Sequence, residues 1–260
     1  MTAGTTGALP TLLLVHGAWH GAWCWERFTS WLEGRGYRVV APDLRKHGAD
    51  ADRTGLRWTR IGDYVEDVAG VLRGLTGPVV VVGHSMGGLI VQKVLERHAA
   101  AGVVLLASVP PGGVLAGTLR TLRKHPLPFL KANLTLSLWP LVESPRVARD
   151  LLFTPETPED DVRRHHARLQ DEAYLGYLEM NGLVVPRPRR VRERTPGLPA
   201  LVMGAEQDGI FTPDEVRRTA RAYGTEAVLI PGSGHDLMLD VRWEEVAARI
   251  DAWVRAAVVG

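Results

Sequence analysis

The chain has 260 residues, 45% of them hydrophobic, which is enough for one α/β domain with a sizeable core. Its 31 basic and 29 acidic residues give a net charge of +2, so we expect no nucleic-acid partner. The single cysteine, Cys24, excludes an internal disulfide and fits a reducing compartment. The first residues carry no basic region, and their apolar run is too short for a signal peptide or a membrane span. We therefore expect a cytoplasmic protein, and we find no signal for an oligomeric state.

Apolar runs that predict buried strands alternate along the chain with segments of helical periodicity. We expect strands at residues 11–17, 37–44, 79–83, 102–108, 199–206 and 226–232. We expect helices at residues 22–36, 61–75, 85–98, 212–224 and 241–258. Strands that are apolar on both faces and alternate with helices predict a mostly parallel sheet flanked by helices.

Residues 110–196 interrupt this alternation, because they contain helix-like patches and many prolines but no strong strand pattern. We interpret them as a helical cap, or lid, inserted into an α/β core formed by residues 1–109 and 197–260. The basic stretch Pro186–Pro196 at the end of this insertion is interpreted as a solvated hinge. An anion site for an acyl-CoA or phosphorylated substrate is the alternative for that stretch.

Gly83-His84-Ser85-Met86-Gly87 fits the pattern G-x-S-x-G, and it lies directly between a predicted strand and a predicted helix. So sharp a turn forces the serine to a positive φ and leaves no room for side chains two residues away. The turn lifts the serine hydroxyl above the carboxyl ends of the strands, where α/β sheets bind ligands. We expect Ser85 to be a nucleophile. The alternative is a glycine-rich turn that only packs a helix close to a strand.

A serine nucleophile needs a base, and the base needs a carboxylate to orient it. His235 stands in a glycine-rich loop after the last predicted strand, and Asp208 and Glu206 follow the strand before it. The order serine, acid, histidine is the one used with this kind of turn. We expect His235 to be the base and Asp208 the acid, with Glu206 as the alternative acid.

An ester transition state also needs two donors for the developing oxyanion. We expect these to be the backbone N–H of Met86, which follows the serine, and that of Ala18, in the loop after the first strand. His84 is expected to pack or bond locally. No cysteine cluster, metal-binding helix motif or phosphate-binding loop is present, so we expect no metal and no cofactor.

The ordered segments "LLLVHGAWHGAWCW", "VVAPDLRKHG", "VVVVGHSMGG", "LVMGAEQDGIFTP" and "IPGSGHDLM" resemble the signature of the α/β-hydrolase superfamily. The opening "HGAWHGAW" is similar to the branch of plant-type methylesterases and hydroxynitrile lyases. The lyases carry threonine where this chain has Gly17, and lysine where it has Asp236, so the resemblance implies an esterase. Lys46 stands where the superfamily usually has a glycine, which leaves the conformation of that loop open.

This resemblance implies a serine hydrolase that cleaves a hydrophobic carboxylic ester or lactone through an acyl-enzyme. We expect an apolar substrate pocket that includes Trp19, Phe129, Trp139, Leu237 and Met238. Three alternatives remain because the fold hosts many activities. They are a thioesterase, a non-hydrolytic enzyme such as a lyase, and a ligand-binding receptor that retains the triad.

Overall fold

The computed structural model describes residues 8–49 and 51–260, and in this part of the chain six parallel strands form one sheet. The strand order is β2-β1-β3-β4-β5-β6. The strands are β1 (Thr11–Val15), β2 (Val39–Val40), β3 (Val79–His84), β4 (Gly102–Leu106), β5 (Ala200–Ala205) and β6 (Ala227–Ile230). All their pairings are parallel, as the strand–helix alternation predicts.

Alternate side chains of the central strands enter two separate hydrophobic clusters, one on each face of the sheet. Leu12 and Leu14 belong to the first cluster, whereas Leu13 and Val15 belong to the second. This period of two is the geometry of a strand, and burial on both faces explains why the sequence shows continuous apolar runs.

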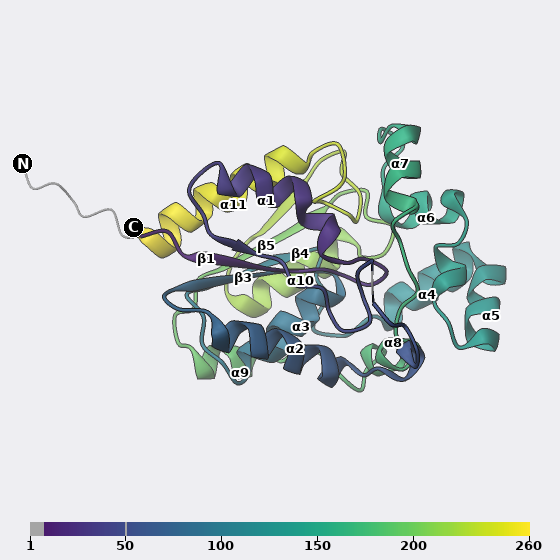
Figure 1. Ribbon diagram of the computed structural model, residues 1–260, viewed down its shortest axis with the longest axis horizontal. Helices are drawn as coiled ribbons and strands as arrows, with labels where there is room; N and C mark the ends of the chain where they lie inside the picture. Colours follow the sequence, from purple (N-terminus) through teal and green to yellow (C-terminus); the bar gives the residue numbers. More distant parts are fainter. Residues whose placement is uncertain (1–7, 50) are drawn as a thin grey trace, which may run out of the picture.

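Helices cover both faces, and this arrangement confirms the predicted layers (Figure 1). On one face lie α1 (Glu26–Glu33) and α11 (Trp243–Val254), which contribute to the first cluster. On the other lie α2 (Ile61–Gly74), α3 (Met86–Leu95) and α10 (Pro213–Tyr223). Short 3₁₀ helices occupy Ala22–Trp25, Leu56–Trp58 and Trp139–Leu141, and a π-helical turn spans Arg255–Val259. No helix among the described residues is both long enough and apolar enough to cross a membrane.

An all-helical insertion separates β4 from β5. It begins with α4 (Leu115–Lys124), α5 (Pro126–Thr135), α6 (Pro145–Leu152), α7 (Glu159–His166) and α8 (Tyr174–Met180). In Figure 1, α4 to α7 gather beyond the carboxyl ends of the strands. We call α4 to α8, with their connecting segments, the cap.

The basic stretch at the end of the insertion differs from the expected hinge. Residues Pro188–Arg194 form a helix, α9, which packs against α3 and α10 at the other end of the sheet from α4 and α5 (Figure 1). Val191 of α9 is fully buried in the second hydrophobic cluster. This helix therefore belongs to a core layer. Only its outward residues are charged, which is why the sequence looks like a solvated segment.

The second strand is also much shorter than residues 37–44. Only Val39 and Val40 pair with β1, at the edge of the sheet, and both are partly exposed. Pro42 follows and has no N–H to donate to a strand pairing, so the chain leaves the sheet there.

Candidate active site

Ser85 occupies a strained turn between β3 and α3. Its φ is 52° and its ψ is −116°, a backbone conformation that residues other than glycine rarely adopt. Its N–H donates to the carbonyl of Leu106 at 3.0 Å. A Cβ atom at Gly83 would collide with the carbonyl oxygen of Gly87, and one at Gly87 would collide with that of Val15. The sequence Gly-x-Ser-x-Gly is therefore required by space as well as by the turn.

His235 and Asp208 come together although they lie on different loops. The Nδ1 of His235 is 2.9 and 2.8 Å from the two carboxylate oxygens of Asp208. The Asp208 side chain is fully buried, and its Oδ1 also accepts hydrogen bonds from the N–H groups of Ile210 (2.7 Å) and Phe211 (2.8 Å). The side chain of Glu206 is exposed. Of the two carboxylates proposed as the acid, only Asp208 contacts the histidine.

The surroundings of His235 set its charge and tautomer. Burial opposes protonation, but the Asp208 carboxylate outweighs this effect and raises the pKa of His235 above its ordinary value. When the ring is neutral, its contact with Asp208 places the proton on Nδ1 and leaves Nε2 as a free base. The His235 ring also packs against Phe211, at 5.6 Å between ring centroids, and against His84, at 4.8 Å.

His84 bonds locally, as expected. Its Nε2 donates to the carbonyl of His235 at 3.0 Å. Burial and the neighbouring His235 lower the pKa of His84 to about 3, so this ring is neutral. The residue before the serine thus ties the turn to the loop that carries His235.

Ser85 opens onto a cavity between the core and the cap, with mainly apolar walls. The core contributes Ala18, Trp19, Met86, Val109, Ile210 and Phe211, and the cap and the segment leading into it contribute Val114, Gly117, Thr118, Thr121, Phe129, Leu138, Leu141, Leu151, Tyr177 and Met180. His235 is not itself among the lining residues, but its ring packs against Phe211, which is one of them.

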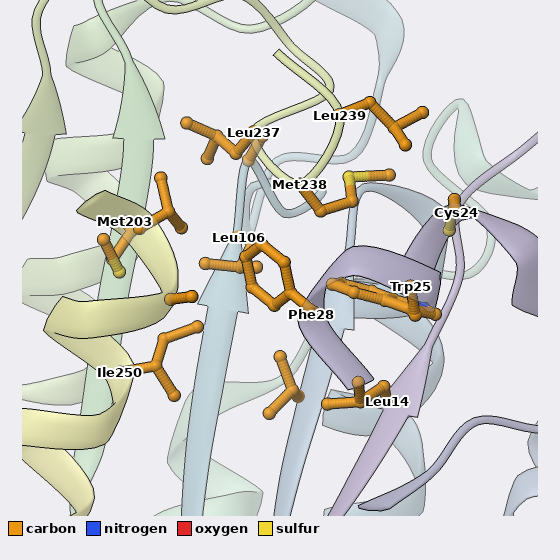
Figure 2. Close-up of a cluster of buried hydrophobic side chains, with 14 of the residues drawn as sticks. Leu14, Cys24, Trp25, Phe28, Leu106, Met203, Leu237, Met238, Leu239 and Ile250 are labelled. Carbon is orange, nitrogen blue, oxygen red and sulfur yellow. The ribbon is translucent and has the colours of Figure 1, made fainter. Parts of the chain in front are cut away.

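Only some of the residues expected in the pocket line this cavity. Trp19 and Phe129 do. Leu237 and Met238 do not: both are fully buried in the first hydrophobic cluster, together with Phe28 and Leu106 (Figure 2). The turn after His235 directs them into the core, so they are not retained as substrate contacts. Trp139 is not among the lining residues either, and it packs against that same cluster.

Ala18 and Met86 both line the cavity beside Ser85. Within residues 8–49 and 51–260, no hydrogen bond uses the backbone N–H of either residue. The peptide that carries the Ala18 N–H is held at its other end, because the Gly17 carbonyl accepts a hydrogen bond from the His16 Nδ1 at 2.9 Å. The Nε2 of His16 accepts from the N–H of Leu44 at 3.1 Å, which fixes the proton on Nδ1. Two free donors therefore stand at the cavity beside the serine.

A family model described as "Alpha/beta hydrolase family" matches residues 12–249. The chain belongs to the alpha/beta hydrolase family. Solved structures of similar fold include a thermophilic esterase from Thermogutta terrifontis, with a TM-score of 0.72 and 23% identity, covering 97% of this chain and 92% of that one. Another is polyneuridine aldehyde esterase, with a TM-score of 0.71 and 18% identity, covering 94% of this chain and 99% of that one.

Curated relatives of this alpha/beta hydrolase match over shorter stretches. Methyl jasmonate esterase 1 of Vitis vinifera is 40% identical over 87 residues, which are 33% of each chain. A probable esterase of Oryza sativa is 32% identical over 163 residues, 57% of this chain and 61% of the relative. The matched stretch thus spans about a third of the grape relative and less than two thirds of the rice relative.

The loop at Lys46 keeps the shape that a glycine would allow. Lys46 has a φ of 64°, in the left-handed region, and its Nζ donates to the carbonyl of Thr54. The departure from the usual glycine of this superfamily therefore changes the residue and not the backbone conformation.

Two buried carboxylates near the site were not identified from the sequence. Glu172 of the cap bonds to His47 and Tyr64, and Asp236 bonds to His20. The sequence offers one signal, because Asp236 directly follows the expected catalytic histidine and so must lie near the site. Nothing near residue 172 indicates that it is buried.

Among the described residues, His84, His235 and Asp236 form a cluster in which the atoms that could bind a metal lie within 4.8 Å of one another. The hydrogen bonds of this group account for its closeness. His84 donates to the backbone of His235, the His235 ring bonds to Asp208, and Asp236 bonds to His20. We assign no metal to it.

Proposed function

We propose that this alpha/beta hydrolase is a serine carboxylic ester hydrolase that uses Ser85, His235 and Asp208. The observation that carries the proposal is the serine held at positive φ on the cavity wall, together with a histidine that bonds to a buried carboxylate and packs against Phe211, which lines the same cavity. The names of the curated relatives, which include methylesterases and other esterases, agree with it.

In the proposed reaction, the Ser85 Oγ attacks the ester carbonyl carbon while the Nε2 of His235 takes the hydroxyl proton. Asp208 holds the His235 ring and stabilises its positive charge. The N–H groups of Ala18 and Met86 donate to the oxyanion of the tetrahedral intermediate. His235 then protonates the leaving alcohol. A water molecule, activated by the same histidine, releases the acid from the acyl-enzyme.

The proposed substrate is a hydrophobic carboxylic ester or lactone, because the cavity walls are largely apolar. Methyl esters of apolar acids are the first compounds to test, since several relatives are named methylesterases. Gly17 supports hydrolysis over the lyase reaction. A Cβ atom there would lie 2.7 Å from the Nδ1 of His84 and 3.0 Å from the Cβ of Ser85, which leaves no room for threonine. The cytoplasmic location and the absence of a cofactor both stay predictions from the sequence.

The test compares wild-type protein with Ser85→Ala on p-nitrophenyl esters and on a panel of methyl esters and lactones. We expect the variant to retain its fold by circular dichroism and to lose at least ~10³-fold in activity, together with labelling by a fluorophosphonate. Near-wild-type turnover by Ser85→Ala would refute the proposal. Wild-type protein that is labelled but turns over none of the esters would instead indicate a ligand-binding receptor.

A further inference from the structure

One peptide unit, between Ala18 and Trp19, is held from both ends by buried side chains. Its carbonyl, from Ala18, accepts a hydrogen bond from the Nδ1 of His20 at 2.7 Å. Its N–H, from Trp19, donates to the Oε2 of Glu172 at 3.3 Å. Trp19 has a φ of 66°, a strained conformation that persists only where the surroundings enforce it. This peptide directly follows the one whose N–H is the proposed oxyanion donor.

The support on the core side is a buried contact between a histidine and a carboxylate. The Nε2 of His20 lies 3.0 Å from the Oδ2 of Asp236, which is fully buried. Both ring nitrogens of His20 thus face acceptors, the Ala18 carbonyl on one side and the Asp236 carboxylate on the other. Burial disfavours the charged form of Asp236, but the adjacent His20 outweighs this effect and lowers the pKa of Asp236.

The support on the cap side comes from Glu172, which is 1% exposed. Its carboxylate accepts hydrogen bonds from the hydroxyl of Tyr64 at 2.8 Å and the N–H of Ala173 at 2.6 Å, and it pairs with the Nε2 of His47 at 3.0 Å. These partners come from α2, from the loop after β2 and from the cap. Glu172 therefore approaches Trp19 as a fixed anion.

Two further contacts join Trp19 to the cap. The N–H of Gln170 donates to the Trp19 carbonyl at 2.9 Å. The indole Nε1 of Trp19 donates to the carbonyl of Leu138 at 3.3 Å. The cap therefore holds the backbone of this residue on both sides, as well as its side chain.

We propose that Glu172 and Asp236 are positioning residues for the oxyanion hole, which act by fixing the Ala18–Trp19 peptide and so the direction of the Ala18 N–H. Without either support, the strained Trp19 backbone relaxes and carries Ala18 with it. The cap is then part of the machinery that stabilises the oxyanion, in addition to covering the cavity. This inference rests on the proposed ester hydrolase function.

The experiment compares Glu172→Gln with Glu179→Gln. Glu179 is a matched control, because it is also buried in the cap and also anchors the cap to the core, through the N–H of Ile61 at 2.9 Å and the Nε of Arg60 at 2.8 Å. No hydrogen bond joins Glu179 to Trp19 among the described residues. Both variants lose a buried anchor, so both are expected to lower the melting temperature.

Of these two glutamate variants, only Glu172→Gln is expected to lower kcat. The expected loss is about 10- to 100-fold, because a small displacement of a catalytic group has effects of that size. The KM is expected to change by less than about threefold, since the lining residues other than Ala18 and Trp19 stay in place. A trifluoromethyl ketone, whose adduct with serine carries an oxyanion, is expected to bind more weakly by the same factor as kcat/KM falls. Asp236→Asn is expected to show the same pattern.

Tyr64→Phe provides a milder second variant if Glu172→Gln fails to fold. It removes one donor to the carboxylate but leaves the negative charge, so we expect the same pattern at smaller amplitude. Unchanged kcat and ketone affinity in Glu172→Gln, or in Tyr64→Phe if only that variant folds, would overturn the inference. An equal loss of kcat in Glu179→Gln would also overturn it. Activity that survives Ser85→Ala would instead refute the hydrolase mechanism itself, so the two failures are distinguishable.

Discussion

Asp208 and Glu206 are two carboxylates on the same loop, but their surroundings differ completely. Asp208 is buried and receives two backbone N–H groups as well as the His235 ring, whereas Glu206 points into solvent. Backbone donors and the histidine keep the Asp208 carboxylate in one orientation. This difference assigns the acid role in the proposed mechanism.

Asp208→Asn is expected to reduce kcat/KM by about 10²- to 10⁴-fold, because an amide can hold His235 in the wrong tautomer. Glu206→Gln serves as the control and is expected to change it by less than about twofold, as for other exposed side chains. Steady-state kinetics on one ester with both variants measures this. A larger loss in Glu206→Gln than in Asp208→Asn would reverse the assignment.

The pH profile should report the charge of His235. The ring must be neutral to accept the serine proton, and Asp208 raises its pKa. Activity is therefore expected to be low in acid and to rise with pH through a midpoint above about 6.5, the ordinary value for histidine. The measurement is kcat/KM from about pH 5 to 9. In Asp208→Asn the midpoint of the pH profile should shift to lower pH, because the carboxylate that raises the pKa of His235 is gone. An unchanged midpoint would contradict this account.

At the scale of elements, α9 and α10 show why some helices are easier to predict than others. Helix α10 is capped at its start by Thr212, whose side chain accepts from the N–H of Glu215, and at its end by Gly224, with a φ of 73°. Both signals are local and appear in the sequence. Helix α9 has four arginines and a single fully buried side chain, Val191. Its place depends on packing against α3, which lies far from it in the sequence, and against α10, the next helix along the chain.

Val191→Ala is expected to reduce the free energy of unfolding by about 1–3 kcal/mol, because it opens a space in the core. The activity of the folded protein should not change, since α9 lies far from the cavity. The control is Arg189→Ala, whose side chain is 87% exposed and should have little effect on stability. Urea denaturation of the two variants tests this. Equal stability of both would mean that α9 is a solvated hinge after all.

At the scale of the whole molecule, the cap and the carboxyl ends of the strands enclose the cavity together. The core supplies the serine and the donors beside it, while the cap supplies about half of the lining residues. Trp19 connects these two parts, because it is in the core loop but bonds to Gln170, Glu172 and Leu138 of the cap. The cap is therefore expected to influence both the substrate choice and the rate.

Phe129→Ala is expected to shift the preference between short and long acyl chains by about 10-fold, the scale of a few lost methylene contacts. Trp139→Ala is the matched control, because this aromatic residue also belongs to the cap but does not line the cavity. It should alter stability more than chain-length preference. The measurement is kcat/KM on a series of p-nitrophenyl esters. The same shift in both variants would show that the cavity assignment is wrong.

The sequence by itself determined the parallel α/β architecture, the strained serine turn and the expected partners of that serine. These features depend on local patterns: apolar runs, helix caps, and glycines that a sharp turn requires. The family also followed, because its motifs appear in a set order along the chain. Trp19 and Phe129 line the cavity, but their neighbours in the sequence did not distinguish them from Trp139, Leu237 and Met238.

Only the tertiary structure decided which side chains face the cavity and which acids are buried. Glu172 lies 153 residues from Trp19 in the chain, and Asp236 lies 216 residues from His20. A carboxylate is tolerated in the interior only when hydrogen-bond donors or positive charges surround it, and here those partners come from distant segments. Local sequence patterns contain no record of such pairings, because the partners become neighbours only when the chain folds.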